Sequence, residues 1–168
     1  MSIRYDSKKA ASILHRLPAG SRRVLDVFCQ RIQEAERGLN AAAALRLKGC
    51  LEDCRGLCCR NLQLDAVFGV PDFAYLLSME PSLETKIAAC LGCEDRFFTS
   101  NCPFLVRGVG PCLFPPDVRP EVCITSFCCG DETLKAEIRR VKICFWKLGV
   151  FLHFRKLPRI HRLLVKTG

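Results

Sequence analysis

The sequence predicts a mainly α-helical protein with an irregular, cysteine-rich centre and little or no sheet. Two longer helices and two shorter ones are expected to brace loops that a metal orders. Three observations predict this arrangement: helical spacing of apolar residues near both ends, short segments that open on proline, and thirteen cysteines among 168 residues. This length is typical of one hydrophobic core, so we expect a single domain over residues 1–168. The domain divides into an N-terminal helix (21–49), a cysteine-cluster metal-binding region (50–129) and a basic C-terminal helical arm (131–168).

A stripe of apolar residues predicts the first long helix. Steps of three and four residues place them on one face of an α-helix: Leu25, Phe28, Ile32, Ala35, Leu39 and Ala42. Ser21 is suited to cap the start of this helix, and Gly49 is suited to end it. The helix therefore leads the chain directly to Cys50.

Two shorter helices and a long irregular stretch are predicted next. Pro71 and Pro81 each stand where a first helical turn would begin, and the second helix is expected to end at Gly92. Alternation of apolar and polar residues indicates a short strand over 62–70. Residues 93–130 contain five prolines and three glycines, which predict loops and turns. A loop of this length needs something to order it, and a metal site would do so.

The second long helix is predicted to start near Asp131, with acidic residues in its first turn as the helix dipole favours. Its apolar seam again follows helical spacing: Leu134, Ile138, Val141, Phe145, Leu148 and Leu152. This seam can pack on the first helix. Pro158 ends or kinks the helix.

Seven of the thirteen cysteines fall into two tight runs: Cys50, Cys54, Cys58 and Cys59, then Cys123, Cys128 and Cys129. The first residues of the chain lack the apolar run of an export signal, so we expect a cytoplasmic protein. Thiols stay reduced in the cytosol, where clustered cysteines more often bind metal than form disulfides. The cysteine pattern therefore predicts metal binding.

The spacing of the cysteines is that of metal ligands. Pairs separated by two to four residues let one tight turn present two sulfur atoms to an ion. The regions 50–59, 102–112 and 123–129 together hold enough thiolates for two sites of four sulfur atoms each. All-thiolate sites suit both zinc and iron–sulfur clusters, so the cofactor is one or the other and the sequence does not separate them.

The order of these motifs resembles that of a known family. The chain reads Cys-x3-Cys-x3-Cys-Cys over 50–59, Cys-Pro-Phe-Leu over 102–105, Gly-Pro-Cys over 110–112 and Arg-Pro-Glu-Val-Cys over 119–123, with a further cysteine at 128. This series resembles the YkgJ-like cysteine-cluster family, a zinc- or iron-chelating domain named for a CxxCxxCC signature. The gaps in the first run are three residues long here, against two in the family.

The resemblance covers about residues 50–129 and implies eight metal ligands: Cys50, Cys54, Cys58, Cys59, Cys102, Cys112, Cys123 and Cys128. It implies a metal-binding protein with an electron-transfer, metal-handling or accessory role. A metal-dependent protein-modifying enzyme is the alternative, because the family is similar to a cysteine domain found in flagellin lysine methylases. No catalytic side chains can be assigned, since neither a Ser-His-Asp nor a Cys-His pairing occurs at a useful spacing.

The remaining cysteines have other interpretations. Cys29 and Cys144 lie beside the helical seams and are expected to pack in the core, as buried free cysteines often do. Whether Cys90, Cys93 and Cys129 also bind metal stays open. Arg119 belongs to the Arg-Pro motif, where a positive charge would stabilise a thiolate site.

The excess positive charge sits at the C-terminal end. The net charge is +9, and residues 138–168 contain nine basic residues and no Asp or Glu. An acidic protein or an anionic membrane surface is the expected partner of this arm, with nucleic acid less favoured. A zinc-dependent nucleic-acid-binding module is a second alternative function. The apolar stretch over 144–154 is too short to span a membrane.

Overall fold

The computed structural model describes residues 2–44, 68–92, 102–106, 111–126 and 132–155, and every structural statement below concerns these residues. They form the helices α1 (Ile3–His15), α2 (Ala19–Ala42), α6 (Val70–Met79), α7 (Leu83–Gly92), α8 (Glu121–Thr125) and α9 (Lys135–Phe154), with a 3₁₀ turn, η2 (Glu132–Leu134), before α9. The β-structure among them is one isolated antiparallel bridge. The prediction of a mainly helical protein with little or no sheet is confirmed.

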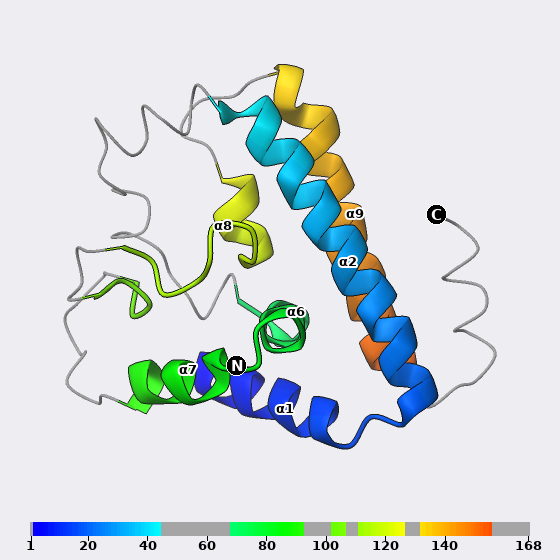
Figure 1. The fold of residues 1–168 in the computed structure, drawn as a ribbon, viewed down its shortest axis with the longest axis vertical. Helices are drawn as coiled ribbons and strands as arrows, with labels where there is room; N and C mark the ends of the chain where they lie inside the picture. Colours follow the sequence, from blue (N-terminus) through cyan, green and yellow to red (C-terminus); the bar gives the residue numbers. More distant parts are fainter. Residues whose placement is uncertain (1, 45–67, 93–101, 107–110, 127–131, 156–168) are drawn as a thin grey trace.

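The two long helices α2 and α9 lie side by side and run antiparallel (Figure 1). Both predicted apolar seams face this contact or the adjoining core, except that Ala42, at the end of the first seam, is exposed. In α2 the buried residues include Leu25, Phe28, Ile32, Ala35 and Leu39; in α9 they are Val141, Phe145, Leu148, Phe151 and Leu152. The rings of Phe28 and Phe151 join the two helices with centroids 5.4 Å apart. This pair forms one wall of the molecule.

The start of the chain differs from the prediction. A helix, α1, precedes the one expected to open the fold, and it packs against α6 and α7. The next helix, α2, begins at Ala19 because Pro18 takes the N-cap position in extended conformation, so Ser21 lies inside the helix rather than at its cap. The predicted end of this helix near Gly49 lies outside the described residues.

The two shorter helices are confirmed. Pro71 is the second residue of α6, and Pro81 stands two residues before the start of α7. Of the strand predicted over 62–70, Phe68 and Gly69 have no strand structure and Val70 opens α6, while residues 62–67 lie outside the described part.

The core gathers around α6, which is seen end-on near the centre of Figure 1. Phe73, Ala74, Tyr75, Leu76 and Leu77 are all buried, because α1, α2 and α9 surround this helix. A Cβ added at Gly149 of α9 would lie 3.4 Å from the Pro71 ring, so the absence of a side chain there lets α9 approach α6 closely. Within the described ranges, no helix is long and apolar enough to cross a bilayer.

Candidate metal centre

Cys102, a predicted ligand, begins a tight turn. The backbone N–H of Leu105 donates to the carbonyl oxygen of Cys102 at 3.2 Å, which closes a four-residue turn. Pro103 takes the second position of the turn, where its fixed φ is favourable. Cys102 itself is buried.

The segment that carries Cys112 pairs with this turn. Leu105 and Cys112 form the antiparallel bridge, flanked by hydrogen bonds from Leu113 N–H to Phe104 O at 2.7 Å and from Val106 N–H to Pro111 O at 3.1 Å. The two predicted ligands, ten positions apart in sequence, thus come from one paired unit. The sulfur of Cys112 accepts a hydrogen bond from the backbone N–H of Phe114, with nitrogen and sulfur 3.4 Å apart.

Aromatic side chains hold this paired unit on the helical frame. The rings of Phe104 and Phe114 lie 4.7 Å apart, and Phe68 contacts both at 5.7 and 6.5 Å. Phe68 in turn contacts Phe73 of α6 at 5.8 Å. All four rings are buried, so the positions of Cys102 and Cys112 are set by packing and not by the turns alone.

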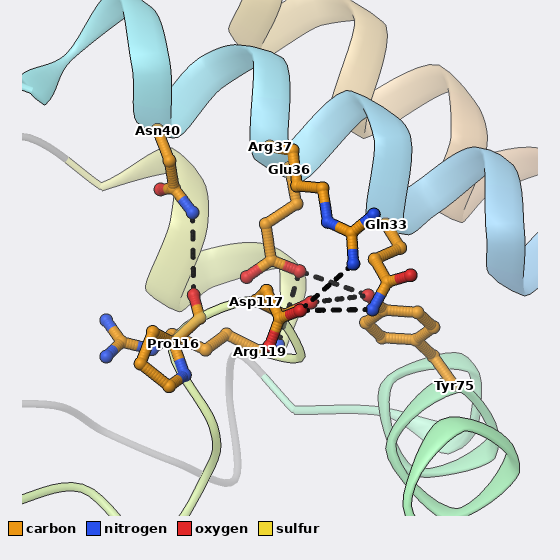
Figure 2. A network of polar contacts seen from close by, with 8 residues as sticks. All are labelled: Gln33, Glu36, Arg37, Asn40, Tyr75, Pro116, Asp117 and Arg119. Carbon is orange, nitrogen blue, oxygen red and sulfur yellow. Dashed lines mark hydrogen bonds and ion pairs between the residues drawn. The ribbon is translucent and has the colours of Figure 1, made fainter.

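Downstream of Cys112, a buried polar network fixes the chain to α2 and α6 (Figure 2). The Tyr75 hydroxyl donates to Oε2 of Glu36 at 3.0 Å and also lies 3.4 Å from the carbonyl oxygen of Asp117. The same Glu36 oxygen accepts the backbone N–H of Arg119 at 3.4 Å. One carboxylate from α2 thus binds both α6 and the Arg-Pro motif.

Three further side chains of α2 extend this attachment, as Figure 2 shows. Gln33 and Arg37 both donate to Oδ2 of Asp117, at 3.3 and 3.2 Å, and Asn40 donates to the carbonyl oxygen of Pro116 at 3.4 Å. We call Gln33, Glu36, Arg37, Asn40, Tyr75, Pro116, Asp117 and Arg119 the anchoring network. It ties residues 116–119 along the C-terminal half of α2.

The electrostatics of Glu36 follow from its burial. Its side chain is fully shielded from solvent, and desolvation raises the pKa of the Glu36 carboxyl to about 7, although the hydrogen bonds from Tyr75 and Arg119 act in the opposite direction. Oε1 of Glu36 has no hydrogen-bond partner within the described part of the chain. Burial and the neighbouring Glu36 also raise the pKa of Tyr75. Burial therefore favours the protonated form of the Glu36 carboxyl.

A second buried carboxylate, Asp72, anchors the other end of this segment. Its Oδ2 accepts the N–H of Gly69 at the start of α6, and its Oδ1 accepts the N–H of Glu121 at the start of α8, both at 2.9 Å. Desolvation raises the pKa of Asp72 to about 6. Because Cys123 lies in α8, this bond helps to position a third predicted ligand.

The eight predicted ligands have different outcomes. Cys102 and Cys112 share one paired unit, and Cys123 lies in α8 at the far end of the anchored segment. The other five lie outside the described residues: Cys50, Cys54, Cys58, Cys59 and Cys128. Among the residues that the structure does describe, no three Cys, His, Asp or Glu side chains form a group that could hold a metal ion. A ligand set made of described residues alone therefore does not exist.

Of the five cysteines that are not predicted ligands, three lie among the described residues and two lie outside them. Cys29 is a buried free thiol in the core, as expected, and burial raises its pKa to about 12. Cys144 is a half-buried free thiol on α9, whose pKa burial also raises, and Cys90 of α7 is partly buried against the core. Cys93 and Cys129 lie outside the described residues.

Sequence reasoning missed Glu36 and Asp72, the two buried carboxylates of this site. Glu36 stands four residues after Ile32 and three before Leu39, so the spacing of the α2 stripe already placed it on the core-facing side. Asp72 follows Pro71 in the first turn of a predicted helix, where a carboxylate is favoured for local reasons alone. Neither position revealed its distant partner.

Comparison of the chain with protein-family models, curated proteins and solved structures finds no match. The fold and the site together define a structural class of protein. A helical frame, built on the antiparallel pair of α2 and α9, holds cysteine-bearing turns through aromatic packing and buried carboxylates.

Proposed function

We propose that this chain is a metal-binding protein that holds zinc or an iron–sulfur cluster through cysteine thiolates. The proposed ligands are Cys50, Cys54, Cys58, Cys59, Cys102, Cys112, Cys123 and Cys128. Its role would be electron transfer, metal handling or service as an accessory subunit, and similarity to YkgJ-like cysteine-cluster proteins is part of the same proposal.

The observation that carries the proposal is the bond from Phe114 N–H to the Cys112 sulfur within a braced turn. A backbone N–H aimed at a cysteine sulfur stabilises the thiolate form, and hydrogen bonds of this kind orient and tune thiolate ligands. Because aromatic packing fixes the turn, the sulfur is held before any metal arrives. A preformed ligand position lowers the ordering cost of binding.

Arg119 gives a second reason. Its Nε is buried and makes no hydrogen bond within the described residues. A buried guanidinium N–H is costly to leave without an acceptor. Four thiolates around a divalent ion leave net negative charge, so a thiolate site beside Arg119 would compensate this donor. The cysteine thiolates and the Arg119 N–H group therefore fit a bound zinc ion or iron–sulfur cluster.

Chain length keeps the other proposed ligands within reach. Cys50 is six positions after Ala44 and Cys128 is five positions after Cys123, so covalent geometry limits each distance to roughly 20 Å. Asn40, close to the end of α2, already contacts Pro116. Chain length therefore permits Cys50 and Cys128 to reach the segment that joins Cys112 to Cys123.

The test is purification of the full chain without oxygen, followed by metal and acid-labile sulfide analysis and an absorption spectrum. Stoichiometric zinc in colourless protein assigns zinc, and iron with sulfide and broad visible absorption assigns a cluster. Protein that carries neither, and that takes up neither on reconstitution, contradicts the proposal.

Cysteine variants locate the site. Cys112→Ser is expected to lose most of the bound metal, because serine replaces a soft thiolate ligand with a poor one. Cys144→Ser is the matched control, since Cys144 is also a half-buried thiol but lies on α9. Equal metal content in the two variants would exclude Cys112 as a ligand.

A further inference from the structure

The helix α9 has a second apolar face that the core does not use. Its buried seam, which includes Val141, Leu148 and Leu152, faces α2 and α6. On the opposite side, at the helical period of 100° per residue, four apolar side chains follow one another: Ile143, Trp146, Val150 and Phe154. We call these four residues the outer stripe of α9.

The outer stripe is open to solvent over most of its length. Trp146 is 65% exposed, Ile143 is 41% exposed and Phe154 is 40% exposed, while Val150 is partly buried. These three are among only five large apolar side chains exposed to this degree in the described residues. Single exposed apolar residues scattered over a surface are ordinary, but a row of them on one helix face indicates an interaction surface.

Positive charges border the outer stripe on both sides. Arg140 and Lys147 lie along one edge, Lys142 lies along the other, and Arg139 stands one turn before Ile143 at the N-terminal end of the stripe. Arg139, Arg140 and Lys142 are exposed. No Asp or Glu occurs from residue 138 to the end of the chain, and the one acidic residue of α9, Glu137, lies in its first turn, 3.9 Å from Arg140.

The surroundings do not reverse this charge. A groove of about 440 Å³ runs between α2 and α9 beside Ile143, and its lining adds Arg31 and a single acidic residue, Glu34. On the other side, a hollow beside Trp146 contains Asp72, which is buried and hydrogen-bonded, and Glu121, which is partly buried near Lys142. The surface around the outer stripe is therefore cationic.

From this arrangement we propose that the outer stripe docks the protein onto an anionic membrane surface, with Trp146 at the level of the lipid headgroups. A line of exposed apolar side chains bordered by Lys and Arg on both edges is the pattern of an interfacial helix. The long basic side chains can extend to the phosphates while the stripe enters the boundary of the acyl chains. Tryptophan prefers this boundary over water and over hydrocarbon.

A membrane is favoured over an acidic protein by the form of the patch. The outer stripe is a linear row of apolar side chains along one helix, over about 17 Å from Ile143 to Phe154. A fluid lipid surface needs no matching shape, only apolar side chains and positive charge.

The single tryptophan of the chain makes the proposal directly measurable, because Trp146 alone reports indole fluorescence. The full chain is mixed with vesicles of phosphatidylcholine, with or without phosphatidylserine. The emission is expected to shift to shorter wavelength with the anionic vesicles and to stay unchanged with the neutral ones. Added salt should reduce the shift, because it screens the attraction between exposed charges.

Charge variants test the role of the border. Arg139→Gln with Arg140→Gln is expected to weaken vesicle binding about 25-fold, since each basic residue near an anionic bilayer contributes about fivefold. Lys8→Gln with Lys86→Gln is the matched control, because it removes two exposed positive charges from α1 and α7. Trp146→Ala, followed by co-sedimentation, should also lose binding while helix content by circular dichroism is unchanged.

Three results would overturn the proposal. The first is equal binding to neutral and anionic vesicles, and the second is equal losses in the border variant and in its control. The third is an emission shift with poly-glutamate but none with anionic vesicles, which would assign the outer stripe to an acidic protein. Metal content is measured on the same samples, so that failure of membrane docking stays distinct from failure of metal binding.

Discussion

Replacement of Glu36 by glutamine should change how stability depends on pH. The folded protein shields this carboxyl completely, and burial raises its pKa from an ordinary 4.5 to about 7. Between these two pH values the folded state keeps a proton on Glu36 that the unfolded chain has released. Stability therefore falls as the pH rises through this window, in contrast to the effect of a carboxylate whose pKa is lowered on folding.

The size of the effect follows from the shift. A displacement of about 2.5 pKa units corresponds to about 3 kcal/mol, at 1.36 kcal/mol for each unit. Glu36→Gln removes the titration but keeps an oxygen that can accept the bonds from Tyr75 and Arg119. The free energy of unfolding of the variant, relative to the native protein, should increase by about 3 kcal/mol between pH 4.5 and pH 8.

Urea denaturation followed by far-ultraviolet circular dichroism, at several pH values, measures this difference. The pKa of Asp72 is also raised, to about 6, so its own contribution to stability falls as the pH rises towards 6, but it does so in both proteins and cancels in the difference. A difference between variant and native protein that stays constant from pH 4.5 to pH 8 would refute the assignment of this titration to Glu36.

Three other predictions concern the frame around the candidate site. Tyr75→Phe should lower the free energy of unfolding by about 2 kcal/mol at pH 8, where loss of the hydroxyl leaves the Glu36 carboxylate with one partner fewer. At pH 5, where Glu36 is protonated, the loss should be about 1 kcal/mol; urea denaturation measures both values. Phe104→Ala should destabilise the protein by about 3–5 kcal/mol, because it opens a cavity between Phe68 and Phe114; thermal unfolding checks this, and a loss below about 1 kcal/mol would mean that the aromatic cluster does not hold the cysteine-bearing turn. Cys29 should resist iodoacetamide in the folded protein, since it is buried with a pKa near 12, and peptide mass analysis should find it alkylated only after denaturation.

Long periodic segments were predictable from the sequence, and residues with distant partners were not. The α9 seam through Val141, Phe145 and Leu148 follows from spacing alone, because helical periodicity is a local property. The helix α1 was missed because it buries few apolar side chains, Ala10, Ile13 and Leu14, around a charged first half. Its stability comes from packing on α6, which no window of sequence contains.

The candidate site divides in the same way. The turn at Cys102 and Pro103 can be predicted from the local sequence, since proline prefers the second position of such a turn. The anchoring network is not, because Glu36 binds Tyr75 at a separation of 39 residues and Arg119 at 83. The sequence alone does not distinguish a buried glutamate from an exposed one, because burial depends on the folded structure.

The pairing of α2 with α9 also sets how freely the intervening chain can vary in length. Closure of residues 43–134 into a loop costs about 4 kcal/mol of chain entropy, a term that grows only with the logarithm of loop length. Ten flexible residues inserted between the described elements would add about 0.1 kcal/mol to that cost. Insertions between the described elements thus carry almost no entropic penalty, while the two helices that close the loop must keep their register.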